Sequence, residues 1–246
     1  MRKFALALSL GASALLLHAD DTAAERLSDS TKVFNEIMAT PDKGIPQDLL
    51  EKAHCVIIVP GMKQAGFVVG GKYGKGFATC RKASGGGWGS PEAVRVEGGS
   101  FGFQIGASST DVVMLVMNER GMRRLREDKF TLGAEASVAA GPVGRQTTAQ
   151  TDVQMSAEIL SWSRSKGLFA GIALTGATLR PDNDTNQELY GRKVAASDIL
   201  AGTMTAPAAA HELMAALGKY SFREDKDKPI ESRAKDGITE ADRKKK

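Results

Sequence analysis

Short apolar runs separated by glycines fill the first half of this sequence and limit the folds that it can adopt. The runs are His54–Val59, Phe67–Val69 and Gly76–Arg81, followed by alternating segments at Val94–Glu97, Ser100–Ile105 and Asp111–Met117. Runs this short, rich in β-branched and aromatic residues, predict strands. Glycine accounts for 27 of the 246 residues, about 11% against an ordinary share near 7%, which favours tight turns and closely approaching strands. With only 8 prolines, the chain is not collagen-like.

Helical patterns lie mainly towards the two ends of the chain. Leu27, Phe34 and Ile37 share one face of a helix predicted over about 22–38. Shorter helices are predicted from residue 45 and over 119–128, 186–190, 196–200 and 207–217, and further strands over 159–163 and 168–179. Because no long helical crossovers separate the strands, they are expected to pair antiparallel. The sequence therefore predicts a single α+β domain over residues 20–222, a barrel- or sandwich-like antiparallel sheet with helices packed from the N- and C-terminal segments.

The two ends of the chain are predicted to lie outside this domain. Arg2 and Lys3 precede an apolar run, Phe4–Leu17, that is too short to span a membrane but suits a signal peptide over residues 1–19. A cytosolic protein with an apolar first helix is the alternative. Residues 223–246 are charged, lack aromatic residues and are expected to form a disordered tail. Export would place the protein in the periplasm or outside the cell.

The two cysteines, Cys55 and Cys80, lie on neighbouring predicted strands. In an oxidising compartment they could form a disulfide, and a bridge closing a loop of this length stabilises by roughly 3.5 kcal/mol in the chain-entropy model. The alternative is two buried thiols that pack as small apolar side chains. Two cysteines and 3 histidines leave little material for a zinc site, so no metal and no cofactor is predicted.

Three local patterns resemble catalytic or ligand motifs but lack an essential part. Ser100 lies in a G-x-S-x-G match, yet the alternation after it predicts strand where a nucleophile elbow needs a helix. The glycines of Gly70–Gly76 resemble a phosphate loop without its Ser/Thr, and better fit a β-hairpin turn with two exposed lysines. Asp182–Asn186 begins like a calcium loop but lacks its glycine and its final glutamate, and better fits a helix-capping loop. We therefore predict no catalytic residue and no enzyme, with a hydrolase as a remote alternative.

Basic residues beside apolar ones are the remaining candidates for function. The first group surrounds a predicted glycine-rich hairpin over Phe67–Thr79 and comprises Lys63, Phe67, Lys72, Lys75, Arg81 and Lys82. The second group lies on the 119–128 helix and its exit and comprises Arg120, Arg123, Arg124, Arg126 and Lys129. A cationic hairpin with an apolar tip could lie on an anionic membrane. Ordinary solvated charge is the alternative for both groups.

The order of segments resembles the SYLF domain, a lipid-binding family that is also described as actin-binding in its fungal members. The matching stretches are Ile45–Leu50, Val56–Gly61, Ala65–Gly71, Gly74–Gly76, Trp88–Pro91, Gly102–Gly106, Asp111–Val113, Leu132–Ala134, Ala140–Gly144, Trp162–Gly171 and Asn186–Gly191. The resemblance spans roughly Leu27–Phe222. It implies binding and not catalysis: eukaryotic members bind phosphoinositide membranes through basic residues and an N-terminal amphipathic helix, and some bundle actin.

Carried over to this sequence, the resemblance makes Lys63, Lys72 and Lys75 candidates for contact with anionic lipid. For an exported protein, an anionic phospholipid membrane replaces the phosphoinositides, and actin binding is an analogy only. The first hypothesis is peripheral attachment to such a membrane through the basic hairpin. The second is a structural or protein-interaction module of the cell envelope without lipid selectivity. The net charge of +4 is too small to indicate a nucleic-acid partner.

Overall fold

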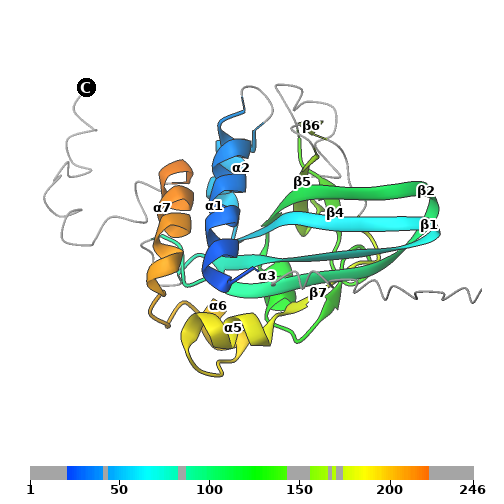
Figure 1. Ribbon diagram of the computed structural model, residues 1–246. Helices are drawn as coiled ribbons and strands as arrows, with labels where there is room; N and C mark the ends of the chain where they lie inside the picture. The colour runs from blue at the N-terminus through cyan, green and yellow to red at the C-terminus, as the bar shows by residue number, and fades with distance from the viewer. Residues whose placement is uncertain are drawn as a thin grey trace, which may run out of the picture.

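The computed structural model describes residues 21–40, 44–82, 87–142, 156–165, 168–169 and 174–221, with the backbone alone at 67–69, 100–106 and 168–169. The predicted signal peptide (1–19) and the predicted tail (223–246) lie outside the described residues, as does the side chain of Phe67. The α+β class and the single domain with helices from both terminal segments are confirmed (Figure 1).

Two long strands form the centre of the molecule. β1 (Cys55–Cys80) pairs antiparallel with β2 (Glu92–Val116) along almost their whole length, with irregularities between Val59 and Met62 and between Gly66 and Val68. The prediction of a hairpin turn at Gly70–Gly76 is wrong, because these residues lie inside β1 and pair with β2. The glycines break the apolar pattern in the sequence, but glycine in a strand also lets another segment of backbone approach closely.

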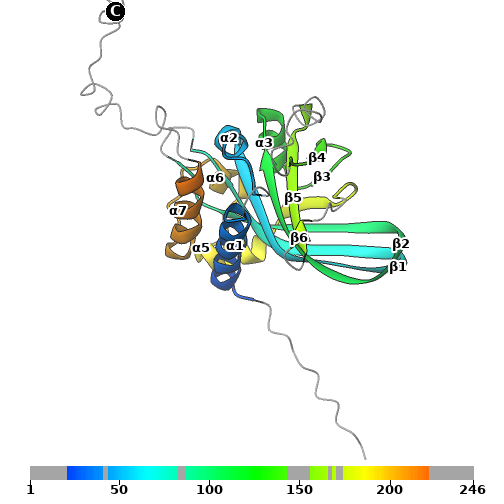
Figure 2. The same ribbon diagram turned by 90° about the horizontal axis from the view of Figure 1, so that it is seen from above.

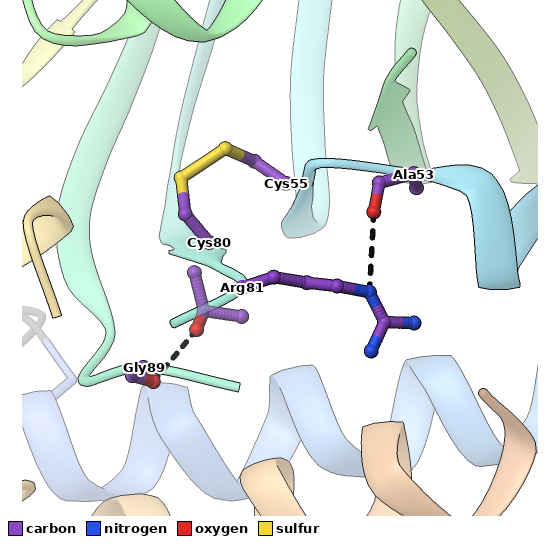
Figure 3. The surroundings of a disulfide bond; sticks show 6 residues. Ala53, Cys55, Cys80, Arg81 and Gly89 are labelled. Carbon is purple, nitrogen blue, oxygen red and sulfur yellow. Dashed lines mark hydrogen bonds between the residues drawn. A yellow bond between two sulfur atoms is a disulfide. The ribbon is translucent and has the colours of Figure 1, made fainter. Parts of the chain in front are cut away.

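β1 folds back on itself, so that its two ends meet. Cys55 and Cys80 are joined by a disulfide with their Cα atoms 4.0 Å apart, which realises the first of the two alternatives for these cysteines (Figure 3). The backbone N–H of Arg81 donates to the carbonyl oxygen of His54 at 2.9 Å. Figures 1 and 2 show the resulting β1–β2 ribbon projecting to one side of the helices. Both halves of β1 therefore belong to one curled sheet.

Shorter strands extend this sheet on both sides of β2. β7 (Thr178–Pro181) pairs with the first half of β2 and with β3 (Phe130–Thr131), while β5 (Ile159–Ser165) pairs with the second half. β6 (Leu168–Phe169) pairs antiparallel with β5, and β4 (Val138–Ala140) pairs with β5 in parallel. The described sheet thus has seven strands, and the β4–β5 pair departs from the all-antiparallel expectation.

Seven helical segments flank the sheet in the described residues. They are α1 (Ala23–Met38), α2 (Gln47–Lys52), α3 (Glu119–Leu125), α5 (Asn183–Tyr190), α6 (Ala196–Leu200), the 3₁₀ turn η1 (Ala208–Ala210) and α7 (His211–Tyr220). α1 begins with a capping box in which Thr22 and Glu25 satisfy each other's backbone N–H groups. α1 and α7 lie side by side against the base of the ribbon (Figures 1 and 2).

The sheet separates two apolar cores. On one face, Val56 and Ile58 pack with Phe34 of α1 and Leu213 of α7. On the other face, Ile57 and Val59 pack with residues of β7 and α6 inside the curl of the sheet. The segment His54–Val59 reads as a continuous apolar run because its alternate side chains enter different cores.

Gly76 is a position where the two halves of β1 approach closely. A Cβ atom there would lie 2.0 Å from the carbonyl oxygen of Ile58, so the backbone would have to move. We expect Gly76→Ala to lower the free energy of unfolding by about 1–3 kcal/mol, measured by urea denaturation. Gly71→Ala is the matched control in the same strand, because no heavy atom lies within 4 Å of its Cβ position. Equal stability of the two variants would contradict the folded-back arrangement.

Candidate functional site

The folding of β1 brings two of the predicted basic residues to one cavity. Lys63 comes from the outgoing half of β1 and Lys75 from the returning half, and both line a cavity of about 460 Å³. Tyr73 also lines this cavity. It is 45% exposed and is the one large apolar residue that is exposed among the described residues. The cavity, here called the α1 cavity, is lined by Asp21, Arg26, Asp29, Lys32, Val33, Glu36, Pro60, Gly61, Lys63, Tyr73, Gly74, Lys75, Asp111 and Arg164.

Charges of both signs line the α1 cavity. Among the described residues that line it, five basic side chains exceed four acidic ones by a single positive charge. Lys63 is exposed, whereas the Nζ of Lys75 lies 3.6 Å from Oδ2 of the buried Asp182. Lys63 is therefore better placed than Lys75 to contact an external anion.

Arg164 of β5 fixes one wall of the α1 cavity. Its guanidinium contacts the carboxylates of Glu36 on α1 and Asp111 on β2, the latter at 3.1 Å. Asp111 also accepts a hydrogen bond from the backbone N–H of Gly61 at 2.9 Å. Burial disfavours the charge of Arg164, but the two carboxylates outweigh burial and raise the pKa of its guanidinium. This network holds α1 against the sheet, which makes Arg164 a positioning residue.

The other residues of the first predicted group lie elsewhere. Lys72 is only 6% exposed, and burial lowers the pKa of its amine, so the prediction of two exposed lysines in this segment is wrong for Lys72. Arg81 donates to the carbonyl oxygen of Ala53 (Figure 3). It also stacks over the ring of Trp88 at 4.4 Å and donates to the carbonyl oxygen of Ser221. Lys82 ends the described part of the chain that follows β1, and its side chain packs near Gly202. Arg81 therefore ties the base of the ribbon to the end of α7.

The second predicted group forms a largely exposed surface on α3. Three of its arginines make ion pairs: Arg120 with Glu158, Arg123 with Glu119 and Arg124 with Glu127. Lys129 is exposed, and Arg126, the C-cap residue of α3, lines a second cavity with Arg95 and Arg180. The structure therefore places the two predicted groups on different parts of the molecule.

The tested motifs lie in ordinary secondary structure. Ser100 lies within β2, with no helix following it. The Gly70–Gly76 segment is strand, and Asp182 is the N-cap of α5, where its carboxylate accepts from Thr185. Among the described residues, no group of three His, Cys, Asp or Glu side chains could hold a metal ion. Within the same residues, no helix has the length and apolarity that crossing a membrane requires.

Several residues of the α1 cavity are missed by reasoning from sequence. In the sequence, Tyr73 lies between two of the predicted lysines, and this position could have indicated that it belongs to the same site. Arg26, Lys32 and Arg164 carry no such signal, because they come from a helix and a strand distant in sequence from β1.

Comparisons with known proteins identify a family model and several relatives that match this chain. A family model described as Ysc84, Las17-binding protein actin regulator, matches residues 97–220. The chain is similar to the SH3 domain-containing YSC84-like protein 1 of Bos taurus, with 33% identity over 201 residues, covering 80% of this chain and 58% of that protein. The protein of the same name in Xenopus laevis is 35% identical over 74% of this chain and 54% of its own length. Protein YSC84 of Saccharomyces cerevisiae is 32% identical over 74% of this chain and 39% of its own length. The chain thus spans little more than half the length of the two animal relatives.

Proposed function

The chain belongs to the Ysc84 (SYLF) family, and from this premise we propose that it is a non-enzymatic binding module that associates peripherally with anionic membranes. The observation that carries the proposal is the placement of exposed Lys63 beside exposed Tyr73 on the folded-back β1. A cation near an anionic bilayer contributes about 1 kcal/mol. A tyrosine ring suits the interface, since its apolar body enters the headgroup region while its hydroxyl stays hydrated.

The proposed contact differs from the predicted one in its residues. Lys72 is buried and Lys75 is paired with Asp182, so neither is a primary contact. Lys63 and Tyr73 take their place, and Lys32 of α1 also lines the α1 cavity. Attachment at the periplasmic or extracellular side of a membrane is part of the same proposal.

We expect the double variant Lys63→Glu/Tyr73→Ser to bind vesicles rich in phosphatidylserine at least about tenfold more weakly than wild type, because it reverses one charge and removes the interfacial ring. Co-sedimentation at low salt measures this. Lys52→Glu on α2 is the matched control, since Lys52 is 67% exposed and lies outside the α1 cavity. The assignment of Lys63 and Tyr73 would be refuted if wild type and the double variant bound the vesicles equally. It would also be refuted if neutral vesicles bound wild type as well as vesicles rich in phosphatidylserine do.

A protein partner is the second candidate function. The description of the matching family model names Las17 binding and actin regulation. If this holds for the chain, it acts as an interaction module, in an envelope or in a cytosol, without lipid selectivity. Co-sedimentation with filamentous actin, and crosslinking in the native host, test it; binding that ignores the lipid headgroup charge supports this candidate over the first.

A further inference from the structure

Three basic residues lie side by side across the centre of the sheet. Lys75 of β1 is paired in register with Arg95 of β2, and Arg95 is paired with Arg180 of β7. Directly opposed residues on neighbouring strands have their side chains on the same face of the sheet, and like charges in such positions destabilise the pairing. A row of three cations therefore needs negative charge beside it.

The protein supplies only part of that negative charge. Glu97 contacts both arginines, at 3.0 Å from Nε of Arg95 and 2.7 Å from Arg180, and Asp182 pairs with Lys75. The buried Nε–H of Arg180 has no hydrogen-bond partner among the described residues. The Nε–H of Arg95 likewise forms no hydrogen bond with a described residue, although its nitrogen lies close to the Glu97 carboxylate. Buried donors without acceptors cost about 1–3 kcal/mol each, so further acceptors are expected here.

A cavity of about 510 Å³ lies beside Arg95 and Arg180. A third arginine, Arg126, reaches it from the end of α3 and makes no ion pair with any described residue. Asn183 and Ser197 add neutral polar residues to the lining, and Asp128 is the one acidic residue among the described residues that line it. The size falls within the range of small-molecule sites, which span roughly 300–1,000 Å³.

We propose that this cavity, the arginine cavity, binds a phosphate-type oxyanion. Guanidinium groups present paired N–H donors that match the geometry of phosphate oxygens, and such charge-assisted hydrogen bonds are about twice as strong as neutral ones. The three arginines that line it come from β2, β7 and the end of α3, and Glu97 forms ion pairs with two of them. The site is distinct from the α1 cavity, because no described residue lines both, and it does not depend on the proposed membrane contact.

The test is calorimetric titration of the whole chain with pyrophosphate at constant ionic strength. We expect saturable binding, and Arg126→Ala is expected to weaken it by about tenfold, since losing one charge-assisted hydrogen bond costs about 1.5 kcal/mol or more. Arg126 is exposed, so the variant is expected to fold. Arg123→Ala is the matched control, because it removes the same charge from the same helix outside the cavity. Equal weakening in both variants would show general charge attraction and overturn the proposal.

A second arm identifies the source of the oxyanion. Vesicles carrying phosphatidic acid present the phosphate as a lipid headgroup, and pyrophosphate presents it free in solution. The site is supported if Arg126→Ala weakens binding to pyrophosphate or to phosphatidic acid vesicles while Arg123→Ala does not. The probe whose binding is weakened identifies the source of the oxyanion. Absence of wild-type binding in both arms overturns the proposed site. The double variant Lys63→Glu/Tyr73→Ser changes no described residue that lines the arginine cavity. Its binding to phosphatidylserine vesicles therefore tests the proposed membrane contact independently of the oxyanion site.

Discussion

Replacing Glu92 with glutamine is expected to raise the free energy of unfolding by about 4 kcal/mol at pH 8 and to change it little at pH 4. Glu92 lies in β2 with its side chain 0% exposed, and neither carboxyl oxygen has a hydrogen-bond partner among the described residues. Burial raises the pKa of its carboxyl from the usual 4.5 to about 8. Glutamine has the same shape and no charge at any pH.

The sign follows from proton binding in the two states. Between pH 4.5 and 8 the folded chain keeps the proton of Glu92, whereas the unfolded chain has released it. Stability falls with rising pH wherever the folded state binds more protons. The contribution of Glu92 is therefore complete below pH 4.5 and is lost as the pH rises towards 8. The charge of Glu92 also affects Tyr190. Burial first, and then the charge of Glu92, raise the pKa of the Tyr190 hydroxyl. This hydroxyl donates to the carbonyl oxygen of Pro91 at 2.7 Å.

Urea denaturation of wild type and Glu92→Gln at several pH values between 4 and 8 measures the difference. The difference in the free energy of unfolding at pH 4 gives the cost of burying the amide. The change of this difference with pH gives the effect of the Glu92 charge. Glu119→Gln on α3 is the control, because its side chain is 74% exposed. Parallel stability profiles of wild type and Glu92→Gln would contradict a buried, unpartnered carboxyl.

Reduction of the Cys55–Cys80 disulfide is expected to lower the free energy of unfolding by about 3.5 kcal/mol. The bond joins residues separated by 25 positions and so restricts the unfolded chain. In the folded chain it fastens the two ends of β1, where Arg81 also bonds to Ala53 (Figure 3). The Arg81–His54 backbone hydrogen bond and the bond from Arg81 to Ser221 lie in the same region.

Urea denaturation of the oxidised and the reduced wild-type chain tests this without changing any other atom. The chain contains only these 2 cysteines, so a reductant acts on one bond. The pH dependence of the free energy of unfolding that Glu92 causes shows whether the reduced chain keeps its fold. It should persist in the reduced chain if the two ends of β1 remain together. A loss below about 1 kcal/mol would mean that the ends of β1 are held mainly by packing.

Local patterns were sufficient to predict most helices and several strands. Thr22 and Glu25 form a capping box that depends on four successive positions, and α6 occupies the predicted 196–200. The run His54–Val59 predicted a strand, and β1 begins within this run at Cys55. These elements are set by spacing, capping and burial over a few residues, and such signals are legible in a sequence.

The long β1 strand was misinterpreted as several short strands with a turn at Gly70–Gly76. Glycine permits a turn, but it also permits the close approach that Gly74 and Gly76 make to Val59 and Ile58. A sequence does not distinguish these uses, because the segment that a glycine approaches can lie far along the chain. The same ambiguity explains why Lys72, expected on an exposed turn, is buried.

The sequence by itself determined the family, the α+β class, the position of most elements and the list of basic residues. Tertiary structure alone decided which of those residues meet. Lys63 and Tyr73 line one cavity because β1 reverses, and Arg95, Arg126 and Arg180 line another because β2, β7 and the end of α3 meet there. Elements form from interactions between near neighbours, whereas a binding site is made by strand register and chain reversal, which depend on contacts between distant residues.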